Sequence, residues 1–491
     1  MSEDLNKKTG KATLWSSVTE IVTKLIVPIV NIILARLLAP EAFGAVATIT
    51  MVITFAEVFT DAGFQKYIVQ HNFESEEELN RGTDVAFITN LVISVLISAL
   101  ITVFRHPIAR FVGSPSLGDA IAVSSLTIIM VAFSSIQMAR FKRDLDFKSL
   151  FFVRMGASLV PLLVTVPLAF ALRNFWALVI GTLATNLFNA VVLTVRSRWK
   201  PKLFYSFKLF KEMFSFTAWT LLESILIWLT VNIDIFLVGN ALSDYYLGIY
   251  KTSMTTVNSY MAIISGAVAP VLFSALSRYQ DDDTKFRETY WHFFKFTAII
   301  AIPMSVGVFV YRDLVTDLLL GAQWGEAAGF IGLWGLMSGI TVVFSNFSSE
   351  VYRAKGNPKL SMLAQALHIA FIVPAVIISL KFGFSALYIT RSLMRLQFVI
   401  VNILFMRLIY KFSVLTMMKN IFPSFVASLG MAVAGCAFIS ISSSMVWQIF
   451  SVFLCIITYF GLLLCFPKTR KEILELPWIQ RRIKRNKGGT K

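Results

Sequence analysis

The sequence predicts an all-α membrane protein that crosses the bilayer about 14 times. The apolar composition, the length of the apolar runs and the position of the basic residues all indicate this fold class. Of the 491 residues, 56% are hydrophobic and only 15% are charged. A soluble protein of this size needs more polar surface than that. Apolar runs of about 20 residues instead match the roughly 30 Å hydrocarbon core of a bilayer.

The apolar runs divide the chain into consecutive predicted spans. We expect the first to be a retained helix, because it is too long for a signal-peptide core and no small-residue cleavage site follows it. The predicted spans are residues 13–36, 40–62, 82–104, 118–139, 148–171, 175–195, 214–238, 246–274, 289–311, 326–349, 360–380, 384–406, 420–441 and 446–466.

Basic residues are distributed unequally between the two sides of the membrane. If the N-terminus is cytoplasmic, the inside segments contain 33 Lys and Arg residues and the outside segments contain 6. The positive-inside rule then places both termini in the cytoplasm. The net charge of +17 is therefore a topology signal, and we expect no nucleic-acid partner.

Cysteine and histidine residues give no sign of a metal centre, a redox pair or a cofactor. Cys436, Cys455 and Cys465 lie in the last two predicted spans, where we expect them to behave as small apolar groups. Their spacing is not typical of zinc or redox motifs, and the four histidines are scattered.

A turn sequence occurs twice along the chain, each time between two apolar runs. Residues 34–49 read LARLLAPEAFGAVATI and residues 238–253 read VGNALSDYYLGIYKTS. At an offset of 204 residues, Leu38 aligns with Leu242, Gly44 with Gly248 and Thr48 with Thr252.

A weaker match follows the fourth span of each set. ARFKRDLDF (139–147) and YRAKGNPKL (352–360) align Arg140 with Arg353 at an offset of 213. Since both matches fall at the same ordinal position, we predict two homologous six-helix bundles. Six is even, so the repeat is parallel, and we expect a cavity between the two bundles.

The segment between the bundles has an amphipathic pattern. Phe207, Phe210 and Phe214 recur at helical spacing, with Lys208 and Lys211 off that stripe, as expected of a helix in the headgroup layer. The predicted parts are an N-terminal bundle (1–200), this interfacial linker (201–213), a C-terminal bundle (214–411), an extra helix pair (412–467) and a basic cytoplasmic tail (468–491).

Cations inside predicted spans are the candidate substrate-binding residues, because charge is costly in a bilayer and usually faces protein or water. Arg391 and Arg395 lie one turn apart and cannot neutralise each other, so they favour a dianionic phosphate. The alternative is that both side chains extend to the membrane surface. The candidate cations are Lys24, Arg154, Lys251, Arg391 and Arg395.

Acidic residues in the spans are candidates for coupling-ion sites or for structural ion pairs. Glu20 and Lys24, four residues apart, are spaced to pair with each other. The sequence leaves open whether protons, sodium or the membrane potential drives any transport. The candidate acids are Glu20, Glu57, Asp61, Glu223 and Asp234.

Several stretches resemble the Wzx-type polysaccharide flippases of the multidrug/oligosaccharidyl-lipid/polysaccharide exporter superfamily. They are LARLLAPEAFGAVA (34–47), DAGFQKYIVQ (61–70), ARFKRDLDFKSL (139–150), DIFLVGNALSDYYLGIY (234–250), VAPVLFSALSRYQDD (268–282) and LLLGAQWGEAA (318–328). The resemblance implies a V-shaped bundle pair in the cell membrane that opens alternately to each side. The implied cargo is an undecaprenyl-pyrophosphate-linked oligosaccharide, moved from the cytoplasmic to the outer leaflet for polysaccharide biosynthesis. Implied partners are membrane lipids and other polysaccharide assembly proteins.

Two other functions compete with this one. A multidrug or small-molecule antiporter of the same superfamily usually has twelve spans, so the extra helix pair counts against it. A polysaccharide polymerase or ligase should display a large outside loop with clustered polar residues. The outside segments here are short and show no catalytic constellation, so we do not expect an enzyme.

We predict that reporter fusions or cysteine labelling will place both termini in the cytoplasm. Because of the unequal distribution of cations, positions 114, 243 and 443 should report outside, and positions 75, 284 and 490 inside. An outside signal at Thr490 would contradict the fourteen-span topology.

Overall fold

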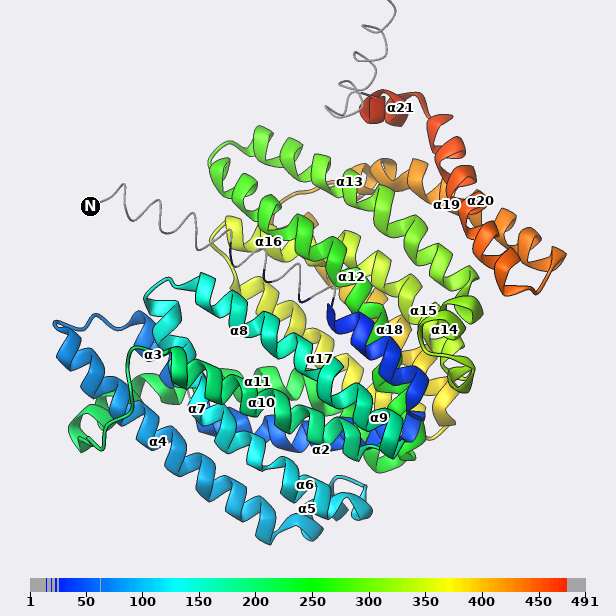
Figure 1. The fold of residues 1–491 in the computed structure, drawn as a ribbon. Helices are drawn as coiled ribbons and strands as arrows, with labels where there is room; N and C mark the ends of the chain where they lie inside the picture. The colour runs from blue at the N-terminus through cyan, green and yellow to red at the C-terminus, as the bar shows by residue number, and fades with distance from the viewer. Residues whose placement is uncertain (1–14, 16–18, 20–22, 24–25, 62, 475–491) are drawn as a thin grey trace, which may run out of the picture. The chain divides into compact units, whose positions relative to one another are not determined.

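The computed structural model describes residues 15, 19, 23, 26–61 and 63–474, and this part of the chain is helical and contains no β-strand (Figure 1). The helices up to the linker are Ile26–Leu37, α2 (Pro40–Asp61), α3 (Phe64–Gln70), α4 (Glu76–Val103), α5 (Arg105–Phe111), α6 (Gly118–Ser124), α7 (Leu126–Arg143), α8 (Phe147–Val160), α9 (Val166–Leu172) and α10 (Trp176–Arg196). The helices after it are α11 (Phe207–Ala241), α12 (Asp244–Arg278), α13 (Asp283–Val310), α14 (Arg312–Leu319), α15 (Ala327–Thr341), α16 (Phe347–Ala354), α17 (Lys359–Leu380), α18 (Gly383–Leu408), α19 (Val414–Ile441), α20 (Met445–Leu464) and α21 (Pro467–Leu474).

The membrane-length helices confirm the predicted all-α polytopic fold class. Within the described residues, 13 helical segments are long and apolar enough to cross a membrane. Each corresponds to one predicted span, from the second to the last. The predicted first span, residues 13–36, lies partly outside the described residues, and the helix Ile26–Leu37 occupies its second half.

Two long helices contain a local change of winding that the apolar pattern did not predict. Residues Pro161–Thr165, between α8 and α9, form a π-helical turn, and so do residues Val342–Asn346, between α15 and α16. The chain stays helical through both turns, as Phe147–Leu172 and Ala327–Ala354, so apolar length alone still identified each span. Wider turns of this kind are frequent at functional sites.

The predicted separate linker helix at 201–213 is wrong in one respect. Helix α11 begins at Phe207 and continues to Ala241, so residues 207–213 are its first turns. The apolar run that follows Phe214 is itself helical, and nothing in the sequence between Phe207 and Phe214 breaks a helix. Leu203 and Phe207 are exposed, as expected of a surface segment.

The chain forms two compact units, residues 1–252 and 253–491, and each is described by itself. The division falls inside α12, so unit 1 contains α11 and the first turns of α12. The bundle boundaries that the sequence predicts, and the cavity between the bundles, remain predictions.

In unit 1 the aligned glycines of the repeated turn lie against each other. A Cβ atom on Gly44 would overlap the carbonyl oxygen of Asp244 and lie 3.0 Å from the backbone nitrogen of Gly248. A Cβ on Gly248 would likewise overlap the carbonyl oxygen of Pro40 and lie 3.0 Å from the nitrogen of Gly44. Pro40 and Asp244 are also 204 residues apart, so this contact between α2 and α12 is symmetric. Small residues allow such close backbone approach between membrane helices.

Backbone hydrogen bonds support the same offset of 204 residues. The Leu38 N–H donates to the Leu34 carbonyl at 2.9 Å, and the Leu242 N–H donates to the Val238 carbonyl at 2.8 Å. The helix that precedes each turn therefore ends in the same way. The first repeat alignment is confirmed at the level of the turn.

The second repeat alignment has the right turn but the wrong offset. Leu145 and Asp146 donate to Lys142 and Phe141, and Gly356 and Asn357 donate in the same pattern to Arg353 and Tyr352. Leu145 and Gly356 both have positive φ, 57° and 71°, so both turns are Schellman motifs. The structural offset is 211, not 213. Aligning basic residue types displaced the alignment by two positions, since the backbone turn is the shared feature.

Basic residues that the sequence assigned to topology also hold unit 1 together at the end where α4 begins and α7 ends. The Arg140 Nη2 donates to Glu76 Oε1 at 2.8 Å, although Arg140 is only 7% exposed. The Arg143 Nη1 donates to the carbonyls of Ile68 and His71, each at 2.8 Å. These bonds fix the end of α7 against α3 and α4.

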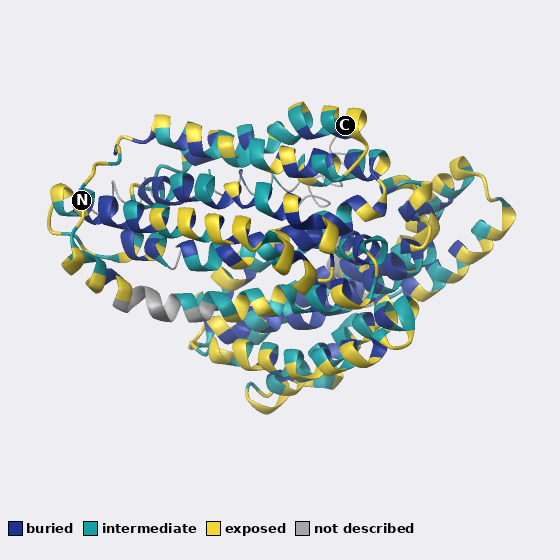
Figure 2. Ribbon diagram, turned by 90° about the horizontal axis from the view of Figure 1, so that it is seen from below, coloured by how far each residue is buried: buried dark blue, intermediate teal, exposed yellow. Residues whose placement is uncertain are grey.

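Unit 2 is arranged around α15 and α16. Of the most apolar stretch in Ala327–Ala354, 78% is buried, against 17% in Phe147–Leu172 of unit 1. Helices α13 and α18 pack on α15, and α13 also packs on α19, which lies beside α20 (Figure 1). The long helices carry exposed residues along their length (Figure 2), as expected for helices that face lipid.

We predict that Gly44→Ala and Gly248→Ala each lower the stability of the purified protein. The added methyl group has to separate two backbones, a kind of overpacking that costs about 1–3 kcal/mol or more. Thermal unfolding in detergent measures the effect. Gly461→Ala in α20 is the control, because a Cβ there meets nothing within 4 Å. Unchanged melting temperatures for both turn variants would contradict the close contact.

Candidate functional site

Unit 1 contains a buried acidic group between α11 and α12. Asp234, 6% exposed, accepts a hydrogen bond from the Tyr250 hydroxyl at 2.9 Å through Oδ2. Lys251, the next residue on α12, lies within electrostatic range of the Asp234 carboxylate. The structure therefore brings together one predicted acid and one predicted cation. Both residues lie close to the repeated turn that begins α12.

Helix α2 carries Thr50, Thr54, Glu57 and Asp61 at helical spacing, and this polar face contacts α11 in unit 1. The Trp228 Nε1 donates to Thr54 Oγ1 at 3.1 Å, and the ring of Trp228 lies 4.6 Å from that of Phe55. Thr54 belongs to the same stripe of α2 as Glu57. The second helix of one predicted bundle thus meets the first helix of the other through a polar contact.

In unit 2, Arg391 and Arg395 of α18 both lie over one aromatic ring. The guanidinium carbon of Arg395 is 3.6 Å from the ring centroid of Trp334 on α15, and that of Arg391 is 5.1 Å away. A cation over an indole face gains about 0.5–2 kcal/mol, more when water is excluded. Trp334 itself is 1% exposed, so the ring is a fixed platform for the two cations.

An asparagine links the platform to the arginine. Asn258 Oδ1 accepts from the Trp334 Nε1 at 3.3 Å and from the Arg395 Nη2 at 3.2 Å. Asn258 is on α12, within unit 2, and it is exposed. It therefore orients both the ring and the guanidinium group at a place that a ligand can reach.

The hydroxyl of Tyr260 on α12 lies near Arg395. The Tyr260 hydroxyl is buried and has no hydrogen-bond partner within the described part of the chain. The hydroxyl packs on Gly335, where a Cβ atom would lie 2.9 Å from the hydroxyl oxygen. Tyr260 also lies within electrostatic range of Arg395. An unsatisfied buried hydroxyl costs free energy, and a ligand or a water molecule can supply the missing bond.

Helices α17 and α18 add a histidine–glutamine pair to this cluster. The His368 Nδ1 lies 2.8 Å from Gln397 Oε1, and the imidazole is within electrostatic range of Arg391 and Arg395. We call the group Arg391, Arg395, Trp334, Asn258, Tyr260, His368 and Gln397 the arginine cluster.

The arginine cluster is suited to binding a polyanion. A guanidinium group presents a planar fork of donors that matches two phosphate oxygens. Here the guanidinium groups lie over an indole face, and an amide oxygen accepts a hydrogen bond from Arg395. Arg391 and Arg395 lie 8 and 12 residues into the 26-residue helix α18 and contact the neighbouring helix α15. This contact argues against side chains that extend along α18 to the membrane surface.

The other predicted site residues lie on different helices or outside the described part of the chain. Arg154 on α8 and Glu57 on α2 are half-buried on their own helices. Lys24 and Glu20 lie outside the described residues, and so do the side chains of Asp61 and Glu223. Within the part of the chain that is described, no three His, Cys, Asp or Glu side chains cluster as metal ligands do.

Sequence patterns missed most of the partners of the two arginines. Trp334 lies in the apolar stretch GLWGLMSG, and Tyr260 and His368 lie in equally apolar helices, so no local signal marks them. Asn258 was the exception, because the eighth predicted span carries the polar residues Lys251, Thr255, Asn258 and Ser265 at helical spacing. That stripe marked Asn258 as part of a polar helix face, and only the structure places it beside Arg395.

Comparison with known proteins identifies the family. The family model described as "Polysaccharide biosynthesis protein" matches residues 33–329, more than half of the chain. The chain belongs to this family. The matched part of this polysaccharide biosynthesis protein contains Gly44, Gly248 and the Asp234–Lys251 pair, whereas Arg391 and Arg395 lie beyond it.

Two named relatives and one solved structure extend the comparison. The lipopolysaccharide biosynthesis protein WzxC of Escherichia coli (strain K12) is 21% identical over 76% of this chain and 75% of its own. The succinoglycan biosynthesis transport protein ExoT of Rhizobium meliloti (strain 1021) is 24% identical over 64% of this chain and 63% of its own. The lipid II flippase MurJ, in an inward closed conformation, superposes with a TM-score of 0.74 over 93% of this chain and 99% of its own, at 15% identity. That last likeness establishes the fold.

Proposed function

We propose that this polysaccharide biosynthesis protein is a flippase. Its proposed cargo is an undecaprenyl-pyrophosphate-linked oligosaccharide, moved from the cytoplasmic to the outer leaflet of the cell membrane. The observation that carries the proposal is the placement of Arg391 and Arg395 on one buried indole. Family membership and the named transport relatives support it.

The chemistry of this cargo fits the arginine cluster. A pyrophosphate carries several negative charges close together, which two guanidinium groups one helical turn apart can bind at the same time. The oligosaccharide needs a polar path across the membrane, while the polyprenyl chain can stay in lipid. Transport requires only that this binding group faces each side in turn, so no covalent step is needed.

The acidic group in unit 1 has a separate role in the proposal. Asp234 is held by Tyr250 and lies near Lys251, an arrangement typical of a structural ion pair inside a membrane protein. We therefore assign Asp234 and Lys251 to fixing α11 against α12. Glu57 remains a candidate for coupling transport to an ion.

Leaflet-specific analysis of the glycolipid tests the function. In depleted cells we expect the pyrophosphate-linked oligosaccharide to accumulate facing the cytoplasm while sugar assembly continues, because synthesis precedes flipping. Normal delivery to the outer leaflet, together with altered export of drugs, would contradict the proposal and favour an antiporter.

The two arginines give a sharper prediction. Arg391→Ala and Arg395→Ala should abolish transport in a complementation assay without preventing membrane insertion. Replacement by Lys should rescue in part, because an ammonium group keeps the charge and loses the bidentate fork. Arg407→Ala is the matched control, since Arg407 is an exposed arginine near the end of the same helix. Full complementation by both Ala variants would contradict the site.

A further inference from the structure

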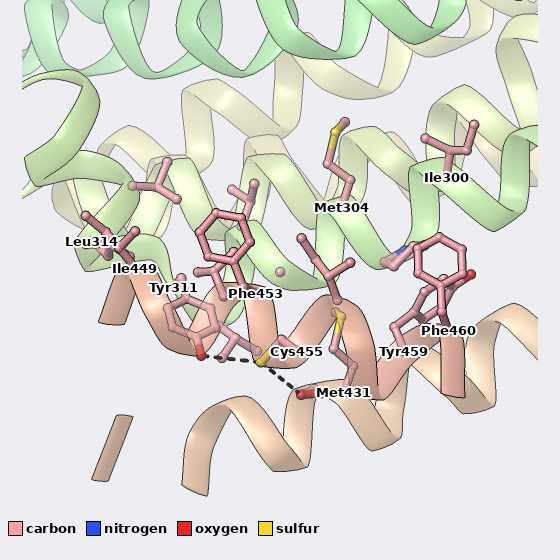
Figure 3. A pocket seen from close by; sticks show the side chains of 18 of the residues that line it. Ile300, Met304, Tyr311, Leu314, Met431, Ile449, Phe453, Cys455, Tyr459 and Phe460 are labelled. Carbon is pink, nitrogen blue, oxygen red and sulfur yellow. Dashed lines mark hydrogen bonds between the residues drawn. The ribbon is translucent and has the colours of Figure 1, made fainter. Parts of the chain in front are cut away.

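Two buried tyrosine hydroxyls of unit 2 show how such a group is satisfied within the protein. Tyr311 lies in the wall of an apolar groove bounded by α13, α14, α19 and α20, and its hydroxyl is 2.8 Å from Ser451 Oγ and 3.3 Å from Cys455 Sγ (Figure 3). The Tyr459 hydroxyl donates to the Ile299 carbonyl at 2.8 Å. Both hydroxyls therefore have partners, as most buried polar groups do.

The hydroxyl of Tyr260 on α12 lacks such a partner. Its oxygen is buried and makes no hydrogen bond within the described part of the chain. The oxygen lies against α15, where a Cβ atom on Gly335 would be 2.9 Å from it. A buried hydroxyl without a partner is unfavourable, so the free energy of the site falls when a ligand accepts a hydrogen bond from it.

Contacts between α12 and α15 place this hydroxyl beside the indole ring that lies under the arginines. Asn258, two residues before Tyr260 on α12, accepts a hydrogen bond from the Trp334 Nε1. The Tyr260 hydroxyl packs on Gly335, the residue that follows Trp334 on α15. Tyr260 is also within electrostatic range of Arg395. The hydroxyl therefore belongs to the arginine cluster by its packing as well as by its electrostatic interaction.

The polar groups that α12 contributes to the cluster are oriented to donate hydrogen bonds. The Trp334 Nε1 and the Arg395 Nη2 can only donate, so both face the amide oxygen of Asn258, at 3.3 and 3.2 Å. The Asn258 Nδ2 group is then directed away from them and can donate elsewhere. The positive charge of Arg395 orients the Tyr260 hydroxyl with its oxygen toward the guanidinium group and its hydrogen away from it.

We propose that Tyr260 is a specificity-determining residue that donates a hydrogen bond to a phosphate oxygen of the cargo. This inference rests on the proposed function, and it adds a neutral donor to the two cations Arg391 and Arg395. A phosphate group presents several acceptor oxygens, so it satisfies the buried hydroxyl. An organic cation accepts no such bond and is repelled by Arg395. Tyr260 therefore favours a phosphate-bearing cargo over the cationic compounds that a multidrug antiporter carries.

Tyr260→Phe tests the inference, with inorganic pyrophosphate as the probe. Titration calorimetry at constant ionic strength measures binding to the purified full-length chain, and thermal unfolding is measured without ligand. We expect Tyr260→Phe to bind pyrophosphate about tenfold more weakly than the wild type, because a hydrogen bond to a charged group is lost. Without ligand the variant should unfold at the wild-type temperature or above it, because the hydroxyl has no partner in the described part of the chain to lose.

Two further Tyr→Phe variants serve as controls. The Tyr290 hydroxyl is also buried without a partner in the described residues, but its ring packs on Phe412, beyond the end of α18, so Tyr290→Phe should leave pyrophosphate affinity unchanged. Tyr459→Phe should give the opposite pattern to Tyr260→Phe. Its hydroxyl bonds the Ile299 carbonyl, for which Pro303 offers no backbone N–H, so this variant should unfold at a lower temperature and bind pyrophosphate normally.

The possible outcomes separate this inference from the proposed function. Wild-type affinity in Tyr260→Phe, together with loss of binding in Arg391→Ala/Arg395→Ala, would overturn the role of Tyr260 and leave the proposed function standing. A lower unfolding temperature of ligand-free Tyr260→Phe would also overturn it, because the hydroxyl would then have a structural role. So would binding of the organic cation tetraphenylphosphonium to the wild type that Tyr260→Phe weakens. A wild-type chain that does not bind pyrophosphate would contradict the proposed function and this inference with it.

Discussion

The close approach of α2 and α12 at Gly44 and Gly248 is the constraint on which much of unit 1 depends. Each glycine occupies space that a side chain would take from the carbonyl oxygen of the opposite helix. Gly44 and Gly248 are equivalent positions of the repeat. In both copies of the turn, glycine allows the backbone of the opposite helix to approach closely. The contact sets α2 beside the start of α12, and α11 then packs on α2 through Trp228 and Thr54. The Tyr250 hydroxyl on α12 donates a hydrogen bond to Asp234 on α11, so this bond joins the two helices on either side of the turn.

Charges in the membrane-length helices are stabilised by specific neighbours, and the type of neighbour separates structural charges from binding charges. Asp234 lies beside a phenol and a lysine, a set that balances its charge. Arg391 and Arg395 lie over one indole ring, and Asn258 accepts hydrogen bonds from that ring and from Arg395, so the contacts orient the guanidinium groups. Two guanidinium groups one helical turn apart repel each other, and a phosphate bound by both would offset that repulsion. The placement of two guanidinium groups on one ring is the reason for proposing that the phosphate binds in unit 2.

The sequence predicted features that depend on local composition and failed where the determinant is distant. Apolar runs located the membrane-length helices because burial in lipid requires length and apolarity alone. The 204-residue offset was correct since Gly44 and Gly248 are both needed for backbone contact. The offset of 213 was wrong because the two halves share the Schellman geometry at Leu145 and Gly356, and not the positions of Arg140 and Lys142. The contact of Trp334 with the arginines could not be predicted. A tryptophan in an apolar helix is indistinguishable in sequence from a core residue, and Arg395 is distant from it along the chain.

The central claim is that this chain moves a pyrophosphate-linked oligosaccharide between leaflets, and reconstitution measures that movement directly. Purified protein is inserted into vesicles that carry a polyprenyl-pyrophosphate oligosaccharide in both leaflets, and a glycan-cleaving enzyme is added outside. We predict that cleavage proceeds to near completion with the wild-type chain and stops at the outer-leaflet fraction with Arg391→Ala/Arg395→Ala. Cleavage that stops at the outer-leaflet fraction with the wild-type chain, as in protein-free vesicles, would contradict the claim.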